Sequence, residues 1–165
     1  MLQEQFWKEF WRIKAQAKYV DLHLARTEMV DRAVKILLAV ASSASIGGWV
    51  LWKDFALVWA AIIASSQVLN AIRQYLPYKD RLRSLAGLSI DLEELAIQVE
   101  DKWLRICAGE LSDEEIRKAL LDLRTKRMKF FNKNFQGTHL PERKFLLKQA
   151  EDSAAEYFSH LYTAC

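Results

Sequence analysis

Two apolar runs in the middle of the chain decide the fold: residues 34–52, VKILLAVASSASIGGWVLW, and residues 55–72, FALVWAAIIASSQVLNAI. Only Lys53 and Asp54 separate them, and apart from this linker residues 36–72 carry no charged side chain. As a helix, a run of ~18 residues is roughly 27 Å long, which is close to the ~30 Å thickness of the hydrocarbon core of a bilayer. The two runs therefore predict a transmembrane helical hairpin.

The composition limits what else the chain can be. With 165 residues, five Gly and two Pro, it has the length of one domain and little room for disordered linkers. The net charge of +3 is too small to indicate nucleic acid by itself. Cys107 and Cys165 have no metal or redox spacing, which fits a reducing compartment better than a disulfide framework. The first residues form an amphipathic pattern of mixed charge, unlike a signal peptide.

Lipid accommodates the hairpin better than a protein core does. A helix that is apolar all round needs either lipid or a large core. The rest of the chain offers about four further helical segments, each with one apolar face, which is too few to enclose two such helices. A soluble helical bundle with an apolar centre remains the alternative, because the serines in both runs weaken insertion compared with Leu and Ile.

Aromatic and basic residues at the ends of the runs predict the orientation. Tryptophans gather at the tip of the hairpin, tyrosines mark the opposite interface, and one lysine lies close enough to that interface to reach the headgroups. These interface anchors are Lys35, Trp49, Trp52, Trp59, Tyr75 and Tyr78. Basic residues are concentrated in the outer flanks of the hairpin, so the positive-inside rule places both termini in the cytoplasm.

Small residues recur every four positions in each run, a spacing that lets helices approach closely in lipid. These candidate packing residues are Ala39, Ser43 and Gly47 in the first run, and Ala56, Ala60 and Ala64 in the second. The stripes either pair within one hairpin or join neighbouring subunits. Polar residues in the inner half of the second run could line a water path or bond to a neighbouring helix. These candidates for lining a pore are Ser65, Ser66, Gln67 and Asn70.

The flanking segments predict three regions: an N-terminal amphipathic helix in residues 1–32, the transmembrane hairpin in residues 33–76, and a cytosolic helical region in residues 77–165. The first helix packs on the cytosolic helices or lies in the membrane interface; we favour packing. It has no breaker before the first apolar run, so it can continue into that run. The expected fold is all-α.

Coiled-coil spacing of three and four residues predicts a long helix over residues 79–108, with Leu85, Leu88, Leu92, Leu95, Val99 and Ile106 on its seam. Gly109 is a plausible stop, and Ser112 with Glu115 forms a capping box that begins the next helix. The short turn makes these two helices an antiparallel pair. Pro141 is expected to open a last helix that buries Leu147, Ala150, Ala154, Phe158 and Leu161.

Basic side chains gather near the end of the second long helix: Arg124, Lys126, Arg127, Lys129 and Lys133. The antiparallel geometry would return this cluster toward the inner leaflet, where each basic residue contributes about 1 kcal/mol of attraction to anionic lipids. A solvated basic face is the simpler interpretation. Nucleic acid is the least favoured partner.

The chain shows no pattern for catalysis. His23, His139 and His160 lack ligand spacing, and no phosphate-binding loop, nucleophile elbow or paired carboxylates appear. We therefore expect no catalytic residues, no cofactor, no metal and no evident ligand pocket.

The layout resembles the SLATT-domain family, two-transmembrane proteins of bacterial conflict systems. The residues that carry the resemblance are Arg32 before the first run, the small-residue hairpin, and the exit Tyr75-Leu76-Pro77 followed by Arg81 and Leu85-Ala86. The resemblance implies a homo-oligomeric effector in the bacterial inner membrane that permeabilises this membrane when a sensor or nucleotide-signal partner protein triggers it in antiphage defence. The alternatives are a non-pore membrane anchor or regulatory subunit, and a soluble helical-bundle scaffold or adaptor.

Overall fold

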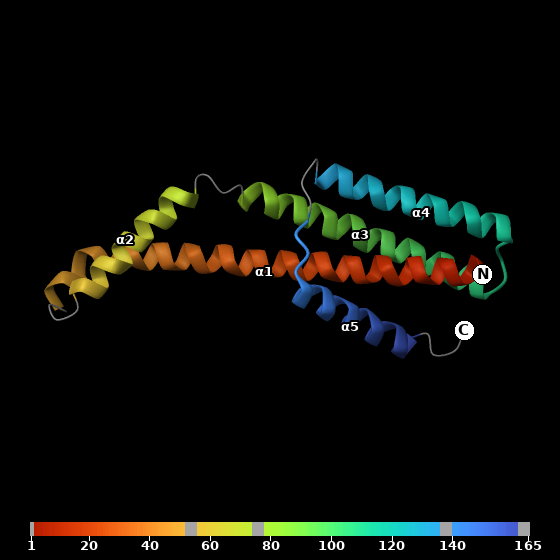
Figure 1. Ribbon diagram of the computed structural model, residues 1–165, viewed down its shortest axis with the longest axis horizontal. Coiled ribbons are helices and arrows are strands. Elements are labelled where there is room, and N and C mark those ends of the chain that lie inside the picture. The colour runs from red at the N-terminus through yellow and green to blue at the C-terminus, as the bar shows by residue number, and fades with distance from the viewer. Residues whose placement is uncertain (1, 52–55, 74–77, 136–139, 162–165) are drawn as a thin grey trace. The chain divides into compact units, whose positions relative to one another are not determined.

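A computed structural model describes residues 2–51, 56–73, 78–135 and 140–161 of the chain (Figure 1). All secondary structure within these ranges is helical, which confirms the predicted all-α fold. In chain order the helices are α1 (Leu2–Leu51), α2 (Ala56–Arg73), α3 (Tyr78–Cys107), α4 (Asp113–Asn134) and α5 (Lys144–Leu161).

The chain divides into two compact units, and α1 contributes to both. The first unit holds Met1–Leu24 and Arg83–Cys165, and the second holds Ala25–Leu82. Helix α1 runs without interruption from the N-terminal amphipathic segment into the first apolar run, as the lack of a breaker predicted.

The first unit is a bundle with one apolar core, formed by the beginning of α1 together with α3, α4 and α5. Within this unit, α1 and α3 lie in the middle and α4 and α5 lie on either side (Figure 1). The core includes the whole predicted seam of α3 and one apolar face each of α1 and α4: Phe6, Phe10, Ile13, Val20, Leu85, Leu88, Leu92, Leu95, Val99, Ile106, Ile116, Leu120 and Leu123. Burial of each such side chain contributes about 1.5–3 kcal/mol, so this core is the main source of stability in the bundle.

Helices α3 and α4 form the predicted antiparallel pair. Gly109 ends α3 with a φ of 74°, a left-handed conformation that glycine adopts without a steric penalty. Ser112 begins α4 with the expected capping box, in which its side chain and that of Glu115 each accept from the other residue's backbone N–H. Ion pairs then join the helices along their length, including Lys102–Asp122 at 3.3 Å and Lys133–Asp91 at 3.1 Å.

The aromatic start of α1 packs on the bundle, as we favoured from the sequence. The ring of Trp7 lies 4.9 Å from that of Trp103 on α3 and 4.8 Å from that of Phe158 on α5, measured between centroids. Phe158 also contacts Phe10 edge to face at 4.9 Å. These contacts join three helices through one aromatic cluster.

The expectation that Pro141 opens the last helix is wrong, because α5 begins at Lys144. The Tyr19 hydroxyl donates to the carbonyl oxygen of Pro141 at 2.7 Å and accepts from the backbone N–H of Arg143 at 3.0 Å. These two bonds hold the segment before α5 against α1 in a non-helical conformation. The predicted apolar face of α5 is confirmed at Ala150, Ala154 and Phe158, which are buried. It is wrong at Leu147, which is 37% exposed while its neighbour Leu146 is buried.

The second unit contains the later part of α1 and all of α2. Many of its large apolar side chains are exposed: Met29, Val30, Ile36, Leu37, Val40, Leu57, Val58 and Val68. Others, such as Val34, Leu38 and Ile63, are half-buried. Among the described residues, no helix has the length and apolar character needed to cross a membrane. The side chains of residues 41–56, which include the predicted hairpin tip, lie outside the described part.

Candidate functional site

The predicted packing stripes of the hairpin are only partly described. Ala39 on α1, and Ala60 and Ala64 on α2, have exposed side chains. Ser43, Gly47 and Ala56 lie outside the residues whose side chains are described. The three described alanines thus present small-residue surface on both helices of the second unit.

Most of the predicted interface anchors also lie outside the described side chains: Trp49, Trp52, Trp59, Tyr75 and Tyr78. Lys35 is described, and its ammonium group forms an ion pair with Asp31 one turn earlier on α1. The pair keeps the charge of Lys35 at the start of the first apolar run.

The candidates for lining a pore lie on α2. Ser65 and Gln67 are exposed, Ser66 is half-buried, and the side chain of Asn70 is outside the described part. The Ser66 hydroxyl donates to the carbonyl oxygen of Ile63 at 2.7 Å. Its polar group is therefore satisfied within its own helix, whereas Gln67 presents its amide at the surface.

The basic cluster of α4 is largely paired with acids of the bundle. Lys126 contacts Asp122 at 3.1 Å, and Lys133 contacts Asp91 of α3 at 3.1 Å. Arg124 and Arg127 both reach Glu9 on α1. Among the described residues only Lys129 of this cluster shows no ion pair, and its side chain is exposed.

Glu9 is the most important polar residue that sequence reasoning missed. Its side chain is 2% exposed, and it contacts Arg127 at 3.0 Å and Arg12 and Arg124 at 3.4 Å each. Burial lowers the pKa of Arg127, and the charge of Glu9 raises it in part. The sequence contained a signal for this site, because Glu9 falls between Phe6 and Phe10 on the apolar face of α1.

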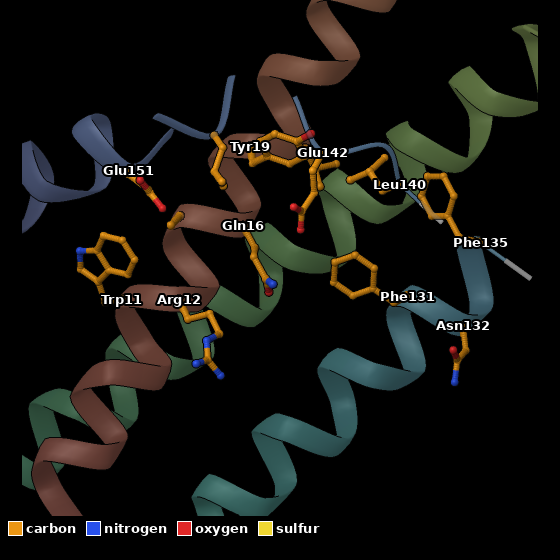
Figure 2. Close-up of a pocket in the computed structure, with 13 residues that line it drawn as sticks. Trp11, Arg12, Gln16, Tyr19, Phe131, Asn132, Phe135, Leu140, Glu142 and Glu151 are labelled. Atoms are coloured by element: carbon orange, nitrogen blue, oxygen red, sulfur yellow. The ribbon is translucent and has the colours of Figure 1, made fainter. Parts of the chain in front are cut away.

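A cavity of about 620 Å³ opens beside this charged network, contrary to the expectation of no ligand pocket (Figure 2). Its size falls within the ~300–1,000 Å³ typical of small-molecule sites. Trp11 lies at one end, Phe131 of α4 and Phe135, the residue after α4, lie at the other, and Gln16 of α1 lies between them (Figure 2). The cavity is thus bounded by aromatic rings from two helices.

The polar groups of this cavity come from three sides. Arg12 and Gln16 belong to α1, Glu142 precedes α5, and Glu151 lies on α5. The side-chain oxygen of Gln16 is buried and accepts no hydrogen bond within the part of the chain that the structure describes. The cavity therefore offers apolar surface together with acceptor and cationic groups.

A second polar cluster joins α1, α3 and α5. The Tyr157 hydroxyl donates to Glu100 at 2.6 Å, and the ammonium group of Lys14 lies 4.0 Å from the centre of the Tyr157 ring and 3.5 Å from Glu100. Burial and the bond to the Glu100 carboxylate raise the pKa of Tyr157 to about 12. The phenol stays protonated at neutral pH and ties α5 to α3.

The structure does not assemble a metal site from the sequence's acids, histidines and cysteines. Among the described residues, no three such side chains come together as ligands. His23 is buried on α1 with its ring 6.0 Å from that of Tyr19, and His160 lies on the last turn of α5. His139 and Cys165 are outside the described ranges.

Comparisons of this chain with family models, with curated proteins and with solved structures find no match.

Proposed function

We propose that this protein is a membrane effector. Its hairpin, residues 33–76, inserts into the bacterial inner membrane with both termini in the cytoplasm. Its helical bundle assembles several copies, and the assembly disrupts or permeabilises the membrane when a partner protein triggers it. The resemblance to SLATT-domain proteins supports the role in antiphage defence and a trigger from a sensor or nucleotide-signal protein.

The observation that carries this proposal is the exposed apolar surface of the second unit. Leu57 is 85% exposed, and Ile36, Val40, Val58 and Val68 are each more than half exposed. In water, apolar surface costs about 25 cal/mol for each Å² left uncovered, whereas lipid removes this cost. Extended apolar surfaces of this kind mark contacts with a membrane or with another protein.

The distribution of charge favours lipid as the cover. The second unit has no charged residue between positions 36 and 52 or between positions 55 and 72. Surfaces that bind soluble proteins carry a polar rim, which these stretches lack. In the bundle, by contrast, charged side chains surround the core and pair with one another.

Membrane insertion is tested by fractionating cells that express the full chain and washing the membranes with alkaline carbonate. The wild-type chain should remain in the pellet. Ile63→Arg should release a large share into the supernatant, because Ile63 lies midway along the second run and an Arg near the centre of a membrane helix costs about 2.5–3.5 kcal/mol. Phe145→Arg is the matched control, since Phe145 is exposed on α5 of the bundle. A wild-type chain found in the supernatant would refute the membrane proposal and favour a soluble scaffold.

Permeabilisation is tested by leakage of a trapped dye from vesicles that contain the purified full chain. We expect leakage to rise with the number of copies per vesicle. Vesicles that stay sealed at every loading, with the protein inserted, would contradict a pore.

A non-pore membrane anchor is the second candidate, and the bond from Ser66 to the Ile63 carbonyl favours it. A serine satisfied within its own helix needs no water path. Gln67→Leu separates the two roles: unchanged toxicity would support the anchor, and loss of both dye leakage and toxicity would support the pore.

A further inference from the structure

Helix α3 carries an apolar stripe on the side opposite its buried seam. Ile90 and Ile97 are each 67% exposed, and Leu104 is 53% exposed. Each of these residues lies seven positions, or about two helical turns, after the one before it, so all three share one face of α3. The seam residues Leu88 and Leu95, by contrast, are fully buried or nearly so. The exposed stripe and the buried seam are therefore separate faces of α3.

Helix α4 carries a second stripe with the same spacing. Leu121 is 68% exposed and Met128 is 64% exposed, seven residues apart. Leu120 and Leu123 point into the core, so Leu121 and Met128 face away from it. The bundle thus exposes two apolar stripes of matching period on neighbouring helices.

The charges beside the two stripes are opposite. Exposed acids flank the stripe of α3: Glu93, Glu94 and Asp101. Exposed bases flank the stripe of α4: Arg117 and Lys129, and also Lys118, which pairs with the exposed Glu114 at 3.2 Å. Asp122, the acid next to Leu121, is already held by Lys102 and Lys126. The α3 face is therefore apolar and acidic, and the α4 face is apolar and basic.

We propose that the α3 face of one copy docks on the α4 face of a second copy of this chain. An antiparallel docking that sets Ile97 opposite Leu121 also sets Ile90 opposite Met128, because both pairs are seven residues apart. The same register sets Asp101 opposite Arg117. This inference deepens the proposed function by naming the surfaces through which the effector assembles.

Charge explains why the contact is between unlike faces. Docking α3 on α3 would bring acids against acids, and docking α4 on α4 would bring bases against bases, each of which is unfavourable. A contact between unlike faces leaves a free α3 face at one end and a free α4 face at the other. Such a heterologous contact continues from copy to copy and closes into a ring when the rotation allows it.

Cysteine cross-linking of the full chain in membranes tests the contact directly. In a background with Cys107→Ser and Cys165→Ser, cells would express chains with Ile97→Cys, chains with Leu121→Cys, or both. Their isolated membranes would then be treated with copper phenanthroline and air, which supply the oxidant for disulfide formation. Disulfides form only where Cα atoms approach within about 7 Å. We expect a product of twice the chain mass when both variants are present, and little from either alone. Equal cross-linking of one variant by itself, or none in the mixture, would overturn the proposal.

Charge reversal provides an independent test that does not depend on new cysteines. Glu94→Lys with Asp101→Lys makes both faces basic, and Arg117→Glu with Lys129→Glu makes both faces acidic. Either double variant alone should raise the concentration for half-assembly in detergent about tenfold, which corresponds to ~1.4 kcal/mol. A mixture of the two should assemble again, because each basic face then meets an acidic one.

The matched control places the same charge change on α5 with Asp152→Lys and Glu156→Lys, both exposed and away from the stripes. It should assemble as the wild type does. A mixture of charge-reversed chains that stays dissociated would contradict the heterologous contact. If the chain forms the cross-links but carbonate extracts it from membranes, the docking is upheld and the membrane role is refuted. If the chain stays in the membrane but forms no cross-links, the docking is refuted and the membrane role stands.

Discussion

Replacement of Glu9 by Gln gives the sharpest test of how the bundle is held together. The Glu9 carboxylate is buried beneath Arg12, Arg124 and Arg127, which come from α1 and α4. The substitution keeps the size of the side chain and removes its charge. It leaves a cluster of three guanidinium groups with no acid at its centre.

The expected cost depends on how far each arginine is buried. Arg127 is 19% exposed, so it loses its partner in a poorly solvated place. Breaking a buried pair by removing one partner costs about 3–5 kcal/mol. Arg12 and Arg124 are about half exposed and add less than about 1 kcal/mol each. We therefore expect Glu9→Gln to lower the free energy of unfolding by about 3 kcal/mol, the lower end of the range, because water reaches part of Arg127.

Near-ultraviolet circular dichroism of the full chain in mild detergent would report this loss, because Trp7 and Trp103 lie in the aromatic cluster of the bundle. Urea titrations would give the free energy of unfolding. Glu4→Gln is the matched control, since Glu4 forms an exposed pair with Lys8. It should leave the urea midpoint close to that of the wild type, because solvent already screens this pair.

A second variant distinguishes loss of charge balance from general disruption. Glu9→Leu combined with Arg127→Met replaces the buried pair by apolar side chains, which is often neutral or stabilising. The double variant should be more stable than Glu9→Leu alone. Two results would contradict the idea that a buried charge network joins α1 to α4. One is a Glu9→Gln variant as stable as the wild type, and the other is a double variant less stable than Glu9→Leu alone.

Two further predictions concern the other polar links of the bundle. The raised pKa of Tyr157 means that the folded state holds its proton more tightly than the unfolded state, so this stabilisation is present below about pH 10 and is lost as the pH rises toward 12. Stability measured across this range should fall more steeply for the wild type than for Tyr157→Phe. Ser112→Ala removes the cap that bonds to Glu115 and should destabilise the bundle by about 1 kcal/mol, seen as a lower urea midpoint. A pH profile equally steep without the phenol, or an unchanged midpoint without the cap, would contradict these assignments.

The parts of the fold that could be predicted are those set by neighbours in sequence. The buried seam of α3 follows from the spacing of Leu85, Leu88 and Leu92, and the turn follows from Gly109 and the capping residues around Ser112. These signals act within one or two helical turns, so they do not depend on which other helix lies nearby. The hairpin itself stays a prediction, because most of its diagnostic side chains are outside the described part.

The parts that could not be predicted depend on contacts between distant residues. Tyr19 holds Pro141 and Arg143, more than a hundred residues away, and this displaces the start of α5 to Lys144. The cavity beside Trp11 exists only because α1, α4 and α5 meet there. Glu9 lies between these two cases. Its position on the apolar face of α1 predicts that its charge is buried and paired, but the sequence does not identify Arg127 as the partner.

The ion pairs with Glu9 and with other acids of the bundle also weaken the attraction of the basic cluster on α4 to lipid. Five unpaired cations near an anionic leaflet would contribute about 5 kcal/mol of attraction, at about 1 kcal/mol each. Two of these cations, however, are paired with Glu9, and Lys126 and Lys133 are paired with Asp122 and Asp91. Lipid would have to compete with these acids, so the attraction falls to about that of Lys129 alone. The charges of α4 thus act mainly between helices: within one chain through these pairs, and in our proposal between chains through the bases that flank the outer stripe.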